Sequence, residues 1–296
     1  MQSRSFAIVA IVLLTLRALS AHAGTGCPNQ ITSCGCVIGA AGDYKVIAPL
    51  NQSPGGSFCL EVDAPGVRLD LGSNSITGSP SSPPPSEVLN VGIQLTKRAA
   101  KAIIVGGGAT ISSFEVGVEI QGGGSFVSEV KADQNGEGID LNTSDVQLTQ
   151  IDASNNRDNG LNLFSASENR ISNLTANGNA SAGIWVSNIS DANRISSFQA
   201  NSNGDVGVRI SALVCGAAIS GPPCHQRGGR GNYLIGGDAS GNQVGIFTEK
   251  GSMSTIIGNT ATMNAQADLE DDSPNCDGDL WFGNTFTIAS PSSCIH

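Results

Sequence analysis

Short alternations of apolar and other residues, each introduced by a glycine, recur along most of the chain. Successive copies of the phrase Gly-apolar-x-apolar stand 25, 21, 22, 23, 24 and 38 residues apart. The alternation predicts short β-strands with one buried face, and the nearly constant spacing predicts a stacked repeat with coils of about 22 residues. The phrase begins at Gly92, Gly117, Gly138, Gly160, Gly183, Gly207 and Gly245.

A second pattern sets the register between the repeats. Six alanines each stand three residues before an asparagine, and an aliphatic residue stands five residues before each alanine. The alanine and asparagine positions are Ala132 and Asn135, Ala153 and Asn156, Ala176 and Asn179, Ala200 and Asn203, Ala239 and Asn242, and Ala261 and Asn264. The aliphatic positions are Val127, Leu148, Ile171, Ile195, Leu234 and Ile256. Such rows are typical of parallel coils stacked about 4.8 Å apart, in which the asparagines form a hydrogen-bonded ladder.

These patterns predict an all-β, single-stranded right-handed parallel β-helix, a solenoid of about eight to nine coils with disulfide-stapled caps. Two stretches, residues 79–87 and 214–231, interrupt the period and are expected to form insertions; the first is rich in proline. The expected order is a signal peptide at 1–23, an N-terminal cap at 24–58, the coils at 59–267 and a C-terminal cap at 268–296.

The start of the chain predicts export. Arg4 precedes the apolar run 7–16, and residues 21–23 form a small-x-small cleavage site. Cleavage leaves 13 basic and 25 acidic residues, a formal charge of −12. Such a chain repels nucleic acid and anionic lipid. We therefore expect a secreted protein, extracellular or periplasmic, that is monomeric and has neither a membrane span nor a nucleic-acid partner.

All eight cysteines follow the predicted cleavage site, and an even number in an exported chain indicates disulfides. Cys27, Cys34, Cys36 and Cys59 are expected to pair among themselves, with the pairing open. The remaining cysteines are expected to pair as Cys215–Cys224, within the second insertion, and Cys276–Cys294, within the C-terminal cap.

Several coils resemble the parallel β-helix repeats of the pectate-lyase-like superfamily, above all residues 169–179 and 193–195. They are most similar to secreted bacterial "right-handed β-helix region" proteins, and residues 67–71 and 281–284 resemble the first and last coils of that group. The resemblance implies the fold over roughly residues 30–296 but no particular activity. The sequence contains no Gly-His-Gly arrangement like that of polygalacturonases and no Asp-Pro-His motif like that of alginate epimerases.

The outward position of the repeated strand gives the first candidate site. Neighbours in this row are expected one coil apart, which makes Glu119 and Asp140 adjacent carboxylates suited to acid–base cleavage of a glycosidic bond. Trp185, Arg209 and Phe247 offer stacking surfaces and a cation for a sugar. A solvated strand face without function is the alternative. The row contains Gln94, Glu119, Asp140, Asn162, Trp185, Arg209 and Phe247.

Two further clusters are candidates. The second insertion carries His225, Arg227 and Arg230, a basic group that could supply a histidine base and hold an anionic group. The C-terminal cap is acidic, and its oxygen ligands are a weak candidate for Ca²⁺, with no other cofactor expected. A solvated acidic surface is the alternative for this cap. The calcium candidates are Asp271, Asp272, Asp277 and Asp279.

The sequence favours a non-catalytic secreted β-helix that contacts polysaccharide or a cell-envelope glycan along its exposed sheet. One alternative is a polysaccharide lyase or glycoside hydrolase working through Glu119 and Asp140, or through His225 and Arg227. Another is a purely structural or adhesin module.

Overall fold

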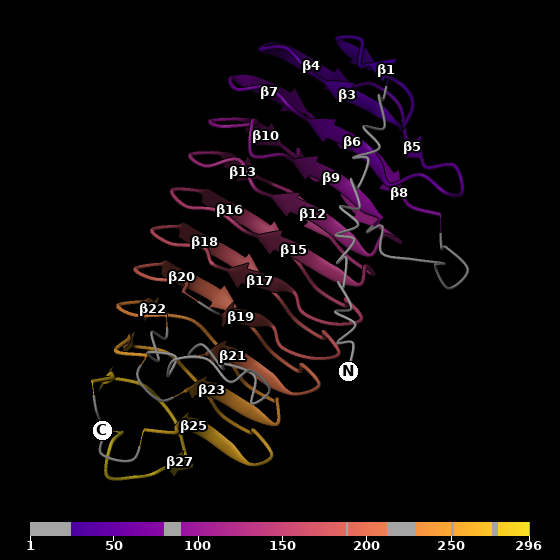
Figure 1. The fold of residues 1–296 in the computed structure, drawn as a ribbon. Coiled ribbons are helices and arrows are strands. Elements are labelled where there is room, and N and C mark those ends of the chain that lie inside the picture. The colour runs from indigo at the N-terminus through magenta and orange to yellow at the C-terminus, as the bar shows by residue number, and fades with distance from the viewer. Residues whose placement is uncertain are drawn as a thin grey trace, which may run out of the picture.

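A computed structural model describes residues 25–79, 90–187, 189–211, 229–249, 252–273 and 278–295. The strands of these residues stack in parallel ladders that run from one end of an elongated molecule to the other (Figure 1). Each strand pairs with its equivalent in the next coil, so the predicted parallel β-helix is confirmed. Within the described residues, the stretch from 58 to 282 makes nine coils.

One ladder, the first sheet, has twelve strands in the described residues. They are β1 (Thr25–Gly26), β3 (Cys36–Ile38), β6 (Phe58–Val62), β9 (Val91–Leu95), β12 (Val116–Ile120), β15 (Glu137–Leu141), β17 (Leu161–Phe164), β19 (Ile184–Ser187), β21 (Val206–Ile210), β23 (Val244–Thr248), β25 (Ala267–Asp271) and β27 (Ala289–Ser290).

The second sheet contains two ladders. The longer ladder is β2 (Gln30–Ile31), β4 (Gly42–Val46), β7 (Val67–Asp70), β10 (Ile103–Val105), β13 (Phe126–Ser128), β16 (Gln147–Asp152), β18 (Arg170–Thr175), β20 (Arg194–Gln199), β22 (Tyr233–Ile235), β24 (Thr255–Ile257) and β26 (Leu280–Phe282). The shorter ladder is β5 (Leu50–Asn51), β8 (Ser75–Thr77), β11 (Thr110–Ser112) and β14 (Lys131–Ala132), and β14 joins β16.

A row of left-handed residues bends the second sheet. In seven successive coils, the residue two positions after the inward core residue has a φ between 53° and 64°. Asparagine and glycine adopt this backbone most readily, but other residues accept it here because the stacked coils hold them in place. The row is Glu129, Gln150, Asn173, Ser197, Gly236, Gly258 and Gly283.

The core is a column of aliphatic side chains, as the sequence predicts. The six predicted aliphatic residues of the second sheet are at most 2% exposed, and the six predicted alanines are fully buried. In the first sheet, residues such as Ile93, Ile139 and Leu161 point into the same column and are fully buried. Burial of apolar surface along the whole length provides the main stabilisation of a solenoid.

The predicted asparagine ladder is also confirmed. From Asn135 to Asn264, the backbone N–H of each asparagine donates to the side-chain oxygen of the next, over 2.7–2.9 Å. The ladder ends on Asp268, whose carboxylate accepts hydrogen bonds from Asn264, Thr287 and Ile288. Burial disfavours the charged form of Asp268, but these hydrogen bonds outweigh it and lower the pKa.

A second ladder was not predicted. Asn169 donates its backbone N–H to the side-chain oxygen of Asn193 over 3.0 Å, and Asn193 donates in the same way to Asn232 over 3.0 Å. Each of these asparagines stands two residues before a core aliphatic residue. The motif Asn-x-aliphatic therefore indicated this ladder in the sequence. The asparagine side chains accept hydrogen bonds from buried backbone N–H groups at a different corner of the coil.

Disulfides close the N-terminal cap. Cys27 pairs with Cys36, and Cys34 with Cys59, which confirms the expected pairing of these four cysteines among themselves. Cys294 is also disulfide-bonded, while its expected partner Cys276 lies outside the described residues. The expected signal peptide, residues 80–87 of the first insertion and the expected Cys215–Cys224 bridge lie outside them too.

In the part of the chain that is described, no helix has the length and hydrophobicity to cross a bilayer.

Candidate functional site

The outward row predicted from the sequence exists in the structure. Glu119 is the register partner of Asp140, and Asp140 is the register partner of Asn162. The row continues through Trp185, Arg209 and Phe247, each again in register with the residue before it. Gln94 precedes Glu119 in the same row. Seven successive coils thus present one continuous line of side chains on the first sheet.

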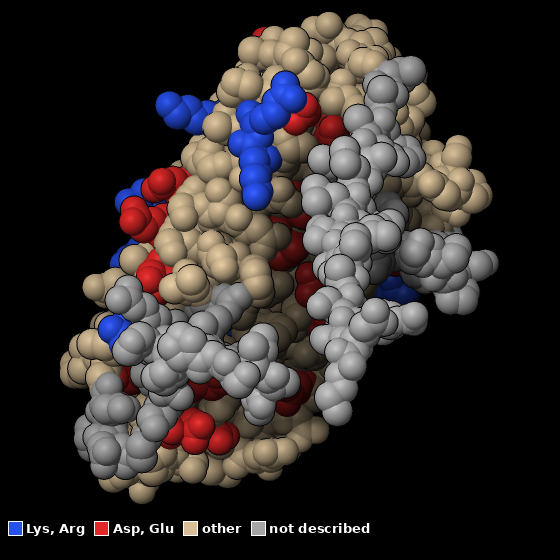
Figure 2. Space-filling view, in the orientation of Figure 1, with Lys and Arg blue, Asp and Glu red and all other residues tan. Residues whose placement is uncertain are grey.

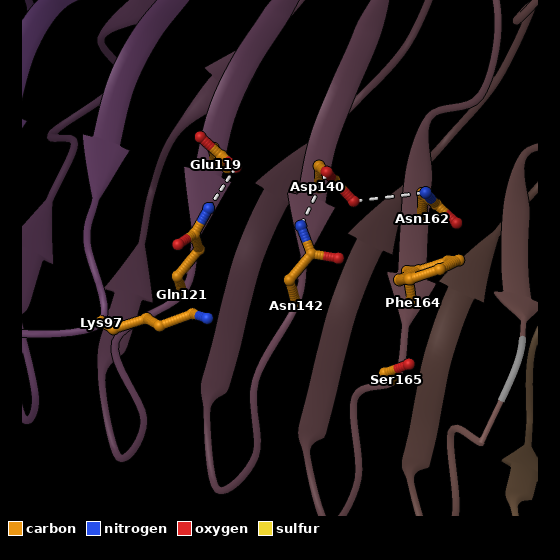
Figure 3. Close-up of a pocket in the computed structure, with 8 residues that line it drawn as sticks. All are labelled: Lys97, Glu119, Gln121, Asp140, Asn142, Asn162, Phe164 and Ser165. Carbon is orange, nitrogen blue, oxygen red and sulfur yellow. Dashed lines mark hydrogen bonds between the residues drawn. The ribbon is translucent and has the colours of Figure 1, made fainter. Parts of the chain in front are cut away.

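A groove runs beside this row. Its volume is about 530 Å³, and six of the residues that line it form two parallel rows two positions apart, on or directly after β12, β15 and β17 (Figure 3). In space-filling view, the same face is hollowed and acidic side chains lie within the hollow (Figure 2). The lining residues are Lys97, Glu119, Gln121, Asp140, Asn142, Asn162, Phe164 and Ser165.

Glu119 is held by two glutamines. Its carboxylate accepts one hydrogen bond from Gln94 Nε2 at 2.7 Å and another from Gln121 Nε2 at 2.5 Å. The residue is only 6% exposed. Both amides approach from its own strand or the preceding coil, so the carboxylate is fixed in orientation without a positive charge beside it.

Asp140 is held in the same manner. Asn142 Nδ2 donates to one carboxylate oxygen over 2.8 Å, and Asn162 Nδ2 donates to the other over 3.2 Å (Figure 3). Burial raises the pKa of Asp140, and the neighbouring Glu119 adds to the rise, while the two amides oppose it. The net effect is that Asp140 binds its proton more tightly than an exposed aspartate does.

Glu137 is a third acid at this site, and the sequence analysis did not identify it. It begins β15, three residues before Asp140, and Asn159 Nδ2 donates to its carboxylate over 3.4 Å. Burial, followed by the charge of Asp140, raises the pKa of Glu137 to about 7. The sequence held a signal, because Glu137 precedes the repeated glycine at a position where other coils have Val91, Val116, Val206 and Val244.

Beyond Asn162 the row changes from acidic to aromatic. The Arg209 guanidinium lies 5.8 Å from the ring centre of Trp185 and 5.4 Å from that of Phe247. Glu249 pairs with Arg209 at 2.6 Å, and Ser211 accepts hydrogen bonds from both Trp185 Nε1 and Arg209 Nε. All three predicted binding residues are half-buried. Arg209 is consequently neutralised within the protein and contributes little free positive charge.

Two acids of the C-terminal cap are buried and do not belong to a solvated surface. Asp268 and Asp271 are 1% and 3% exposed. Asp271 follows Ile210 and Thr248 in an inward row of the first sheet, and its carboxylate accepts hydrogen bonds from Ser273 N–H and Trp281 Nε1. These acids are buried because they satisfy backbone and indole donors at the end of the core.

The calcium candidates do not come together as a set. Asp272 is exposed, whereas the Asp279 carboxylate accepts hydrogen bonds from Ser252 Oγ and Ser254 N–H. Asp277 lies outside the described residues. Across the described ranges, no three His, Cys, Asp or Glu side chains converge in a way that could hold a metal ion. Calcium binding at this cap stays an untested expectation.

Of the three candidate residues in the second insertion, the structure describes only Arg230. His225 and Arg227 fall outside the described residues. Arg230 is exposed at the start of the next described segment, and its backbone N–H donates to Asp191 over 2.7 Å. Neither Arg230 nor Asp191 is among the residues that line the groove.

Comparison with known proteins supports the fold. Residues 91–217 match the family model described as right handed beta helix region. The Dettilon tailspike protein superposes with a TM-score of 0.66 at 15% identity, over 88% of this chain and 54% of the tailspike chain. The periplasmic alginate epimerase AlgG gives a TM-score of 0.50 at 12% identity, over 81% of this chain and 68% of the epimerase. No curated protein sequence matches the chain.

These likenesses establish the architecture. The chain spans about half the length of the tailspike chain, and identities of 12–15% carry the fold alone. The predicted resemblance to the pectate-lyase-like superfamily is therefore confirmed at the level of a right-handed parallel β-helix. One fold serves many activities, so the function of this protein depends on the residues of its own groove.

Proposed function

Since the chain is a right-handed parallel β-helix, we propose that the groove on its first sheet binds a polysaccharide outside the cytoplasm and that the protein does so without cleaving it. The observation that carries the proposal is the lining of the groove. Oriented carboxylates lie beside amides on consecutive coils, and Phe164, which also lines the groove, is 48% exposed. Polar groups of this kind bind hydroxyls, and an aromatic ring packs against the apolar face of a sugar.

The regular spacing of the groove also suits a polymer. Equivalent side chains repeat at about 4.8 Å along the axis of the β-helix. A long ligand laid along the axis meets Glu119, Asp140 and Asn162 first and then the aromatic residues Trp185 and Phe247. AlgG, a structural neighbour, is named as an alginate epimerase, which is in keeping with a polysaccharide ligand.

Export supports the proposed location. Two disulfides in the N-terminal cap form and persist in oxidising compartments, and the sequence predicts a signal peptide before them. We therefore place the protein in the periplasm or outside the cell.

Binding without cleavage is favoured because both oxygens of Glu119 and both oxygens of Asp140 already accept amide hydrogen bonds. These carboxylates are built to be fixed acceptors. A second function, glycoside hydrolysis or lyase activity, is favoured by one observation. The pKa of Glu137, about 7, suits a general acid at neutral pH, and Asp140 lies beside it.

The test is to incubate the purified protein with a panel of neutral, acidic and amino polysaccharides and to record both retention in affinity electrophoresis and new products by mass spectrometry. Retention without products, weakened by Phe164→Ala, supports the proposal. The matched control is Tyr233→Ala, which removes a 44% exposed aromatic ring from the second sheet and should leave retention unchanged.

Two outcomes count against the proposal. Products that disappear in Glu137→Gln or Asp140→Asn make the protein an enzyme and establish the second function. Neither retention nor products from any polysaccharide of the panel leaves the groove without a glycan ligand and favours a structural or adhesin module.

A further inference from the structure

The acidic part of the groove has no counter-charge. Glu119 and Asp140 lie on two adjacent coils, and neither takes part in an ion pair within the described part of the chain. The hydrogen bonds that hold these two carboxylates come from neutral side-chain amides. Amides orient a carboxylate but leave its charge in place.

The nearest cations are engaged elsewhere or lie at the rim. Arg209 pairs with Glu249 at 2.6 Å, and Arg98 pairs with Asp63 at 3.0 Å. Lys97 lines the groove, but its exposed position leaves its ammonium largely hydrated. One exposed, hydrated lysine does not balance the carboxylates of Glu119 and Asp140, so the groove keeps a negative potential.

The same outward row is acidic at its ends. Glu61 precedes Gln94 in the row, and Glu270 follows Phe247. A polymer along this face therefore meets carboxylates at four of the nine positions from Glu61 to Glu270. A polyuronate would bring its own carboxylates into this field at a high electrostatic cost, since like charges in a partly desolvated groove repel strongly.

A ligand with ammonium groups meets the opposite situation. An ammonium carries one positive charge and three N–H donors, and charge-assisted hydrogen bonds to carboxylates are about twice as strong as neutral ones. The lone pairs that remain on Glu119 and Asp140 are acceptors without protein donors. Phe164 offers an apolar surface to the ring that carries the ammonium.

We propose that the groove selects polysaccharides rich in free amino sugars, and that the carboxylates of Glu119 and Asp140 bind their ammonium groups. This inference rests on the proposed glycan-binding function and specifies its ligand class. It separates this protein from neighbours such as AlgG, whose named substrate is alginate.

Isothermal titration calorimetry with three hexamers tests the inference. The hexamers are glucosamine, N-acetylglucosamine and galacturonic acid, titrated into the full chain at mildly acidic pH, low salt and with EDTA present. The first two differ only in acetylation of the amine. We expect the glucosamine hexamer to bind at least about tenfold more tightly than its acetylated counterpart, no detectable binding of the galacturonate hexamer, and weakening by added salt.

Matched variants tie the selectivity to the groove. Asp140→Asn keeps the shape of the side chain and removes one charge, and it should weaken glucosamine binding about tenfold while leaving binding of the acetylated hexamer nearly unchanged. Glu168→Gln removes the same charge at an exposed corner outside the groove and should change neither. Circular dichroism and the melting temperature confirm that each variant is folded.

The failure of the inference and that of the proposed function are distinguishable. Equal affinity for the two glucosamine hexamers, or preference for galacturonate, overturns the inference while glycan binding stands. Equal losses in Asp140→Asn and Glu168→Gln also overturn it, since attraction would then come from the net charge of the protein. If none of the three hexamers binds and no polysaccharide of the larger panel is retained, the proposed function itself fails.

Discussion

Glu119 and Asp140 occupy equivalent positions on adjacent strands, and each is held by amide side chains in place of a cation. The register of the ladder brings them together, and the amides two positions further along each strand, Gln121 and Asn142, fix their orientation (Figure 3). The arrangement stores negative charge on a rigid surface. Such a surface is suited to a ligand that supplies hydrogen-bond donors and positive charge.

The first prediction concerns Glu137 and pH. Its pKa in the folded protein is about 7 against an ordinary value of 4.5, so the folded state binds a proton more tightly than the unfolded state. The resulting stabilisation is fully present below about pH 4.5 and is lost as the pH rises through about 7. We expect this residue to reduce the free energy of unfolding by about 2 kcal/mol between these limits, allowing for its partial exposure.

Urea unfolding at several pH values checks this prediction. Glu137→Gln keeps a neutral side chain at all pH values, so it should flatten this part of the pH dependence and should be more stable than the wild type near pH 8. Glu168→Gln, at an exposed corner, should retain the wild-type slope. If the free energy of unfolding of Glu137→Gln depends on pH as in the wild type, the pKa of Glu137 is not raised by its surroundings and the prediction is contradicted.

The second prediction concerns the repeated glycine. A Cβ at Gly160 would lie 2.5 Å from Ala153 O and 2.7 Å from Asn179 Nδ2, so Gly160→Ala forces the backbone of adjacent coils apart. We expect a loss of about 2–3 kcal/mol in the free energy of unfolding, measured by urea titration. A Cβ at Gly39 meets nothing within 4 Å, and Gly39→Ala should cost less than about 0.5 kcal/mol. Equal effects of the two substitutions would contradict the close stacking of the coils.

The third prediction concerns the asparagine ladder. Asn179 is 1% exposed; its side-chain oxygen accepts two hydrogen bonds from Asn156, and its Nδ2 donates to Asn203. Asn179→Ala leaves a buried backbone N–H without an acceptor, so we expect a loss of about 2–3 kcal/mol and a lower melting temperature. Gln199→Ala, on an exposed outward position of β20, is the control. A melting temperature for Asn179→Ala equal to that of the control would rule out a structural role for the ladder.

The fold could be predicted from the sequence because the same position in every coil has the same surroundings. Ile171 and Ile195 stack on each other, as do Asn179 and Asn203, so the period in the sequence is the period in space. The outward row followed from the same reasoning, and the predicted neighbours Glu119 and Asp140 are register partners. The repeat in the sequence therefore predicts the features that all coils share, which are the aliphatic core, the asparagine ladder and the outward row.

The features that the sequence analysis missed occur where single coils depart from the pattern. Glu137 replaces the valine of other coils, and its shifted pKa depends on its burial and on Asp140 nearby. Asp271 stands in a row that is otherwise largely aliphatic, and its partner Trp281 comes from a different sheet. From the sequence, a carboxylate near the end of the chain is expected to be exposed to solvent. The hydrogen-bond donors that allow Asp271 to be buried come close to it only in the folded protein.

The most direct test of the central claim, that a ligand occupies the groove of the first sheet, is intrinsic tryptophan fluorescence during titration with the glucosamine hexamer. The chain has two tryptophans. Trp185 lies in the outward row beside Asn162, whereas Trp281 is buried in the core at 4% exposure. We predict a saturable change in emission that disappears in Trp185→Phe, while calorimetry shows that this variant still binds. Binding detected by calorimetry with unchanged Trp185 emission would place the ligand elsewhere and contradict the account.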